Sequence, residues 1–227
     1  MWPARVIALL GGRVEPNLLQ LMKEYYDARA PEYDEWYRGL GRFDGLDRPQ
    51  WDDELHELER TIAALPPART LDLACGTAFL TRHLRGDVTG LDQSERMLAI
   101  ARKRMPKASF ILGDALDLTF PDRSFERVFT GHFYGHLRER ERERELFLSE
   151  ARRVASELVV VDAAVRPDQR RVEQRQERIL SDGSQWAVYK RYFTGRQLAD
   201  ELRGQVLYDG RWFVVVVSWS TSRTDGM

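Results

Sequence analysis

Residues 71–80 read LDLACGTAFL and combine an apolar run, one acidic side chain and a glycine within ten positions. The short apolar run, bounded by small residues, is typical of a strand that is covered on both faces of a sheet. Asp72 is costly inside such a strand unless something binds it. Gly76 marks a place where the backbone turns tightly or lets a ligand approach closely. The stretch therefore predicts a strand that delivers a ligand to the turn at its end.

The composition is that of one ordinary folded domain. The chain has 227 residues, 43% of them hydrophobic, and a formal net charge of −1. This length allows a proper core, and the near-neutral charge argues against disorder and against a nucleic-acid partner. The single cysteine, Cys75, rules out an internal disulfide and favours a reducing, cytoplasmic location. No apolar run approaches the roughly 20 residues of a membrane span, so none is expected.

Three regions are expected along the chain. Residues 1–16 carry a short apolar patch without a convincing cleavage site, and we expect a leader, for which disorder is one interpretation. Residues 17–66 are predicted to be helical, with a break at Ala30-Pro31 and a short helix that has Pro31 at its first position. A further helix before Pro66-Pro67 repeats its apolar residues at helical spacing. Residues 67–222 are expected to form the ligand-binding domain.

Strands and helices alternate beyond Pro67, which predicts a parallel sheet with helices on both faces. Asp209-Gly210 lies between two strand-like runs and predicts a closing antiparallel hairpin. The alternating charges of Arg138–Glu145 predict a solvated helix face. The predicted strands are 70–74, 87–92, 108–114, 125–132, 157–165, 185–193 and the two runs within 205–219. The predicted helices are 77–84, 94–105, a charged helix that follows residue 138, and 194–202.

Acidic residues recur where the first three predicted strands end, at Asp72, Asp92 and Asp114. Ligands of such sheets bind beyond the carboxyl ends of the strands, and a carboxylate there can accept both hydroxyls of a ribose. The dinucleotide fingerprint needs three glycines, whereas CGTAFL has one, and three carboxylates would repel a pyrophosphate. They suit a nucleoside that carries a sulfonium and an ammonium group, which is S-adenosylmethionine (SAM).

Three segments together resemble the successive motifs of class I SAM-dependent methyltransferases, most of all the small-molecule group related to quinone-biosynthesis enzymes. These segments are LDLACGTAFL, GLDQSERMLAIAR and FILGDALDLTFPDRSFERVF, and the resemblance covers roughly residues 25–165. It implies an α/β, Rossmann-like, doubly wound and mainly parallel seven-stranded sheet, with an antiparallel C-terminal hairpin and an N-terminal helical lid. It implies SAM as cofactor, S-adenosyl-L-homocysteine (SAH) as product, and methyl transfer to N, O or C of a small, aromatic or planar acceptor.

The resemblance also assigns the cofactor site. Asp72, Ala74, Gly76 and Thr77 would surround the methionine moiety. Asp92 would hold the ribose hydroxyls, although a charge that stabilises the start of the next helix is the alternative. The remaining positions would be Gln93 beside the ribose, Met97, Asp114 and Ala115 at the adenine, and Thr130 and Gly131 at the sulfonium. For Met97, ordinary core packing is an equal alternative.

The segment YDARAPEYD, residues 26–34, resembles a YDxxAxxYD element that closes over the cofactor in related enzymes. Tyr26 and Tyr33 match its aromatic positions, and an aromatic face attracts a sulfonium cation. Arg29 would pair with the cofactor's carboxylate. The alternative is a helix that only packs its aromatic side chains onto the domain, and both can hold together.

His132 and His136 follow the fourth predicted strand and are the candidate catalytic bases. A base is needed only where the acceptor arrives protonated, and the rate would then fall as an imidazole with a pKa of about 6.5 takes up a proton. The pair lacks a third metal ligand, so no metal is expected. His136 can instead cap the loop.

The aromatic and basic residues of 185–193 would face the acceptor, which favours a planar and anionic small molecule, unless this strand is simply buried against the sheet. The oligomeric state stays open, and a homodimer is one assembly compatible with the sequence. Two other classes remain as alternatives: a SAM-binding module without catalysis, and an NAD-type oxidoreductase, which the missing glycines disfavour.

Overall fold

The computed structural model describes residues 18–138, 142–167, 169 and 171–220. The predicted leader, residues 1–16, lies outside these ranges. Within them, no helix is both long enough and apolar enough to cross a membrane.

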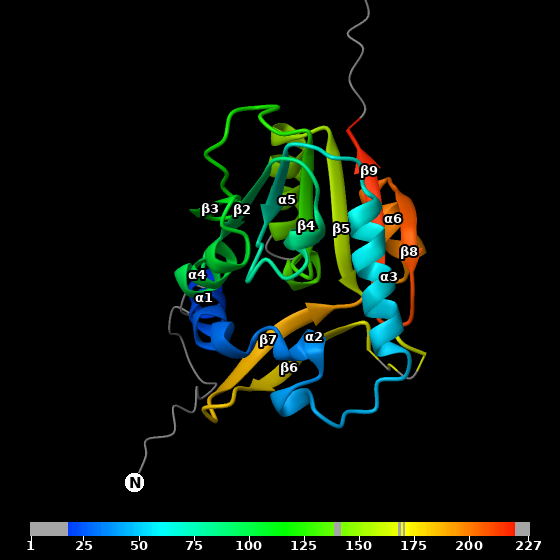
Figure 1. Ribbon diagram of the computed structural model, residues 1–227. Coiled ribbons are helices and arrows are strands. Elements are labelled where there is room, and N and C mark those ends of the chain that lie inside the picture. The colour runs from blue at the N-terminus through cyan, green and yellow to red at the C-terminus, as the bar shows by residue number, and fades with distance from the viewer. Residues whose placement is uncertain (1–17, 139–141, 168, 170, 221–227) are drawn as a thin grey trace, which may run out of the picture.

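A seven-stranded sheet with the order β3-β2-β1-β4-β5-β9-β8 forms the centre of the molecule (Figure 1). Strands β3, β2, β1, β4 and β5 run parallel, and β9 pairs antiparallel with both β5 and β8. The predicted mainly parallel sheet with a C-terminal hairpin is thereby confirmed. The strand order reverses beside β1, the position where open α/β sheets bind their ligands. The strands are β1 (Thr70–Leu73), β2 (Val88–Asp92), β3 (Ser109–Leu112), β4 (Arg127–Gly131), β5 (Glu157–Ala163), β8 (Gln205–Asp209) and β9 (Phe213–Trp219).

Helices cover both faces of the sheet because successive strand residues point to opposite sides. In β9, Val214 and Val216 pack with α5 and α6 on one face, whereas Val215 and Val217 pack with α3 on the other. Ser94 caps α4 as predicted, its hydroxyl accepting the Met97 N–H at 3.1 Å. The covering helices are α3 (Trp51–Ala64), α4 (Glu95–Arg104), α5 (Glu143–Val154) and α6 (Gly195–Leu202).

The helix predicted over residues 77–84 is wrong. The chain there forms turns and a single 3-10 turn, η3 (Thr81–His83). Ala74, Gly76 and Ala78 have φ angles of 58°, 55° and 59°, so the backbone alternates into the left-handed region and cannot continue as a right-handed helix. This tight turn leaves the end of β1 open to a ligand.

A second sheet of two antiparallel strands, β6 (Glu173–Ile179) and β7 (Gln185–Arg191), lies apart from the main one. The sequence pattern predicts β7 but no element at β6. The reason is that β6 reads EQRQERI, so its period of two alternates one polar residue with another and not polar with apolar. We call this pair of strands the β6–β7 ribbon.

The charged tract Arg138–Glu145 differs in part from the predicted solvated helix. Helix α5 begins only at Glu143, and residues 139–141 lie outside the described ranges. Arg144 is 6% exposed, lies 3.8 Å from Glu201 and donates to the Tyr189 hydroxyl at 3.3 Å. At this position the charge pattern marks an internal ion pair.

The N-terminal segment runs beneath the carboxyl ends of the parallel strands, on the same side as the β6–β7 ribbon (Figure 1). The predicted break at Ala30-Pro31 is confirmed, although Pro31 lies in a 3-10 turn and the next α-helix starts at Glu35. Its elements are α1 (Leu18–Arg29), η1 (Ala30–Glu32), α2 (Glu35–Arg38) and η2 (Gly41–Phe43). The segment and the ribbon thus enclose the end of the sheet where a ligand is expected.

Candidate functional site

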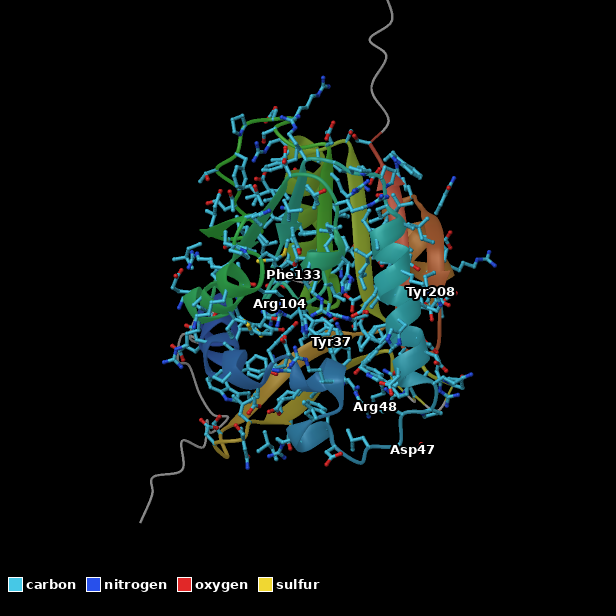
Figure 2. All side chains as sticks on the ribbon, viewed as in Figure 1. Tyr37, Asp47, Arg48, Arg104, Phe133 and Tyr208 are labelled. Carbon is cyan, nitrogen blue, oxygen red and sulfur yellow. The ribbon has the colours of Figure 1, made fainter. Side chains whose placement is uncertain are left out.

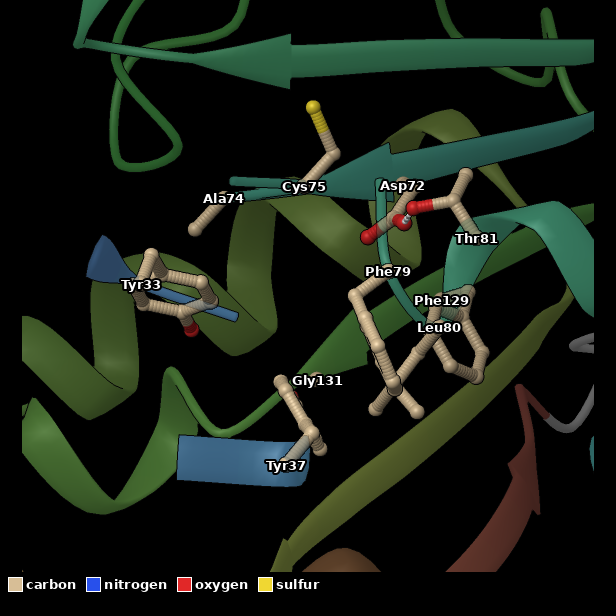
Figure 3. Close-up of a pocket in the computed structure, with 10 residues that line it drawn as sticks. All are labelled: Tyr33, Tyr37, Asp72, Ala74, Cys75, Phe79, Leu80, Thr81, Phe129 and Gly131. Carbon is tan, nitrogen blue, oxygen red and sulfur yellow. Dashed lines mark hydrogen bonds between the residues drawn. The ribbon is translucent and has the colours of Figure 1, made fainter. Parts of the chain in front are cut away.

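A small pocket opens at the end of β1 (Figure 3). Figure 3 shows Asp72 and Thr81 on one side of it and Tyr33 and Tyr37, from the N-terminal segment, on the other. Four of the predicted cofactor residues meet here: Tyr33, Asp72, Ala74 and Gly131. The pocket is lined by Tyr33, Tyr37, Asp72, Ala74, Cys75, Phe79, Leu80, Thr81, Phe129 and Gly131.

Asp72 is a buried carboxyl group with one unused oxygen. Its Oδ2 accepts the Thr81 hydroxyl at 2.6 Å, whereas its Oδ1 is buried and has no hydrogen-bond partner. Burial raises the pKa of Asp72 to about 8, and the nearby charge of Asp92 adds to the rise. A buried acceptor without a donor is costly, so this oxygen is suited to a cationic donor of a ligand.

Asp92 ends β2 and shapes the turn after β1. Its Oδ2 accepts the Gly76 N–H and its Oδ1 the Ser94 N–H, both at 2.8 Å. Burial raises the pKa of Asp92 to about 6, although these N–H donors oppose the rise. Because each carboxylate oxygen has two lone pairs, both oxygens can still accept a further hydrogen bond. The carboxylate therefore holds the turn and stays available to a diol.

The predicted lid residues contact the same turn. A side chain at Gly76 would lie 3.7 Å from the ring of Tyr33. Arg29 is 9% exposed, donates to the Tyr25 hydroxyl and lies 5.2 Å from the centre of the Tyr33 ring. Among the residues that the structure describes, no carboxylate forms an ion pair with Arg29. Tyr26 packs between Tyr33 and His136, with ring centres 6.3 Å from each, and burial raises the pKa of its hydroxyl well above 10.

Two further residues, Asp27 and Asp34, hold the N-terminal segment in place, and neither is among the residues predicted from the sequence. Asp27 accepts the Ser94 hydroxyl at 2.6 Å. Asp34 accepts the Thr77 hydroxyl at 2.6 Å and forms an ion pair with Arg104. Figure 2 labels Arg104 in the molecule. The signal was present, since both are the aspartates of the YDxxAxxYD pattern.

The other predicted cofactor residues do not line the pocket. The Thr77 hydroxyl bonds to the N-terminal segment, and Thr130 donates to the Leu73 carbonyl at 2.8 Å, which joins β4 to β1. Met97 is buried at the start of α4, and Gln93 lies in the turn between β2 and α4. Asp114 is exposed and accepts the Leu116 N–H at 2.9 Å, and Ala115 is buried in the core.

His132 is enclosed by aromatic rings. It follows β4 with a φ of 61° and is 9% exposed, with Trp36 at 5.1 Å and Phe213 at 5.8 Å between ring centres. Its Nε2 is buried without a hydrogen-bond partner. Burial lowers the pKa of His132 to about 4, so the expected value near 6.5 is wrong for this residue. The imidazole is neutral at physiological pH.

His136 lies closer to the predicted lid. Its Nδ1 is 2.6 Å from the Tyr189 carbonyl oxygen, and since a carbonyl only accepts, Nδ1 carries the proton. The lone pair of Nε2 is then available as a base. Burial and the positive charge of Lys190 lower the pKa of His136 well below 6.5, so the sequence-based value is wrong here too.

A buried ion pair connects the β6–β7 ribbon to the main sheet. Lys190 on β7 lies 2.5 Å from Asp162 on β5, and both are almost fully buried. The second oxygen of Asp162 accepts the Gly135 N–H at 2.7 Å, in the loop between the two histidines. The pair therefore fixes the ribbon relative to His132 and His136.

The strand order, the acidic end of β2 and the glycine turn after β1 are features of class I SAM-dependent methyltransferases, and the chain is similar to proteins of this class. Residues 71–158 match the family described as a methyltransferase domain. The chain is similar to demethylmenaquinone methyltransferase of Thermotoga maritima, with 35% identity over 150 residues. That match covers 64% of this chain and 59% of the relative, so the chain spans well under two thirds of the relative's length.

Two solved structures resemble the chain over nearly its whole length. They are described as the DhpI–SAH complex and the DhpI–SAM–HEP complex. Each has a TM-score of 0.69, with 26% and 27% sequence identity respectively. The first match covers 91% of this chain and 98% of the other, and the second 90% and 99%.

Proposed function

We propose that this protein is an enzyme that transfers the methyl group of SAM to N, O or C of a small organic acceptor and releases SAH. The observation that carries the proposal is the unpartnered Oδ1 of Asp72 in the pocket beside a turn held by Asp92. A carboxyl group at that place suits the ammonium of SAM, and Asp92 suits its ribose. The names of the relatives support a small acceptor.

In this proposal, each part of SAM is bound by a different set of residues. Asp72 binds the ammonium group, with Ala74, Gly76 and Thr77 along the methionine moiety, and Arg29 pairs with its carboxylate. Asp92 holds the ribose, with Gln93 beside it. Tyr26, Tyr33 and the backbone of Thr130 and Gly131 surround the sulfonium. The adenine is held by Met97, Asp114 and Ala115.

Methyl transfer is an in-line displacement, so the protein contributes mainly by aligning the acceptor atom with the methyl group. Where the acceptor arrives protonated, Nε2 of His136 accepts its proton. His132 lies deeper among aromatic rings and serves as the second candidate. The N-terminal segment acts as a lid that keeps water away. One cysteine among 227 residues fits a reducing cytoplasm, and neither a nucleic acid nor a membrane surface belongs to the proposal.

Calorimetry with SAH and with NADH tests the cofactor. We expect SAH to bind and NADH not to bind. Asp92→Ala removes a charged hydrogen-bond partner and should weaken SAH binding by about 1.5–3 kcal/mol. Asp87→Ala is the matched control, because Asp87 precedes the other end of β2 and its side chain is exposed. Equal SAH affinity in wild type and a folded Asp92→Ala variant would contradict the assignment.

Turnover is tested by SAH release with a panel of small acceptors. SAH binding without release from any acceptor would favour a non-catalytic SAM-binding module. NADH binding in place of SAH would instead favour an oxidoreductase. Sedimentation of the protein under the same conditions decides between a monomer and a homodimer.

A further inference from the structure

One face of the β6–β7 ribbon turns toward the N-terminal segment. Along β6, Gln174, Gln176 and Arg178 are partly buried, whereas their neighbours in the strand are exposed. Arg178 is paired in register with Trp186 of β7, so the two side chains share a face. The Trp186 ring centre is 5.8 Å from that of Tyr25 on α1. Arg178 therefore lies on the face of the ribbon that meets α1.

Arg178 has no acidic partner on this face. One of its Nη atoms donates to the Gln176 side chain, whereas its Nε is buried without an acceptor. In the described part of the chain no carboxylate lies within ion-pair distance of it. Neighbouring cations are neutralised: Lys190 by Asp162, and Arg191 by Glu201 at 2.9 Å. A guanidinium held partly buried without a counter-charge is costly unless a ligand supplies one.

The face of the ribbon that carries Arg178 lies near His136, the candidate base of the proposed reaction. A chain of ring contacts joins this face of the ribbon to the candidate base: the Tyr25 ring, which contacts Trp186, lies 4.9 Å from that of Tyr26, and the Tyr26 ring lies 6.3 Å from that of His136. The proposed function assigns Arg29 to the carboxylate of the cofactor. Arg178 then remains for the other substrate, on the same side as the candidate base His136.

We propose that the methyl acceptor carries an oxyanion and that Arg178 of the β6–β7 ribbon binds this group, an inference that rests on the proposed function. The oxyanion is a carboxylate, phosphate or phosphonate group. The planar guanidinium offers two parallel N–H donors to such a group. A neutral quinol would leave the charge of Arg178 uncompensated. The acceptor is thus distinguished from the quinones named for the curated relatives by its charge.

The test is calorimetry on the full-length protein saturated with SAH. The probes are benzoate, phenylphosphonate and inorganic phosphate, with benzamide as the neutral counterpart of benzoate. We expect at least one anion to bind at least ten-fold more tightly than benzamide. Comparison of the three anions then identifies which oxyanion is preferred. Anions that all fail to bind, or that bind no better than benzamide, would overturn the proposal.

Variants connect the anion to Arg178. Replacing Arg178→Gln should weaken anion binding by about ten- to a hundred-fold, the range of a hydrogen bond between charged groups. Arg178→Lys should retain part of the affinity for the anion. Arg175→Gln should bind the anion as tightly as the wild type, since Arg175 is exposed on the opposite face of the same strand. SAH affinity should stay the same in all three variants. Unchanged anion binding by Arg178→Gln would remove Arg178 from the site, whereas failure of SAH to bind the wild type would instead refute the proposed function.

Discussion

At the scale of single residues, the site depends on carboxyl groups that are hard to ionise. Asp72 and Asp92 lie at the ends of adjacent strands, and burial raises the pKa of both. They differ in their partners, because Asp92 accepts two backbone N–H groups whereas one oxygen of Asp72 accepts none. Asp72 is therefore the group whose protonation should change when a cation binds.

We predict that SAM binding releases a proton from Asp72. With a pKa of about 8, the ligand-free carboxyl group is mostly protonated at pH 7, and a bound ammonium group favours its ionised form. Below pH 8 the proton must leave, so SAM affinity should rise from pH 6 to 8 and then level off. Calorimetry at pH 7 in buffers of different ionisation enthalpy measures the release. Asp72→Asn should show none, and a wild type without any release would contradict this role.

The histidines lead to a second prediction. Burial keeps His132 and His136 neutral, so a base role predicts a rate that stays constant as the pH falls through 6.5 and decreases only at a clearly lower pH. His136→Ala should lower the rate by about 10²–10⁴-fold, the effect of losing a positioned base, while SAH affinity stays unchanged. The exposed His56 provides the control variant His56→Ala. A His136→Ala rate within a few-fold of wild type would favour catalysis by positioning alone.

At the scale of elements, the N-terminal segment is held by side chains from the turn after β1 and from α4. Asp34 bonds to Thr77 in the turn after β1 and to Arg104 at the end of α4. Arg104 also donates to the Thr77 carbonyl at 2.6 Å. The turn after β1 and the N-terminal segment are thus one connected unit.

Asp34→Ala should release this unit. The change leaves the Arg104 guanidinium and the Thr77 hydroxyl without their acceptor, so we expect a loss of about 1–3 kcal/mol in the free energy of unfolding. Hydrogen exchange should become faster in α1 and α2 but not in β5. Asp44→Ala, an exposed aspartate in the following loop, is the control. Unchanged exchange in α1 and α2 would show that other contacts hold the segment.

Local chemistry explains which elements the sequence predicts. The strands β1, β2, β4 and β5 have apolar residues on both faces, so their pattern is visible from sequence alone. Strand β6 is polar on both faces and is a strand because β7 pairs with it, which no local pattern records. The helix predicted at 77–84 does not form, although its apolar residues are suitably spaced. Ala74 and Ala78 adopt left-handed backbone angles in the turn after β1, and the local sequence does not indicate these angles.

At the scale of the whole molecule, two layers added to a common sheet create the enclosed site. The N-terminal segment and the β6–β7 ribbon both lie at the carboxyl end of the parallel strands (Figure 1). The sequence predicts Asp72 and Asp92 because each acts within its own strand and turn. It does not reveal Arg178 or the Lys190–Asp162 pair, because their surroundings come from segments far apart in the chain.

Closure of these layers around a ligand should stabilise the entire fold. At a SAH concentration of 100 times Kd, binding adds about 2.7 kcal/mol to the free energy of unfolding. For a domain of this size, this corresponds to a rise in Tm of roughly 5–10 °C. Thermal unfolding followed by circular dichroism measures the shift. NADH at the same concentration should leave Tm unchanged, because the turn after β1 has one glycine and two carboxyl groups where a pyrophosphate would lie. An equal rise with NADH, or none with SAH, would contradict the assignment of this pocket to SAM.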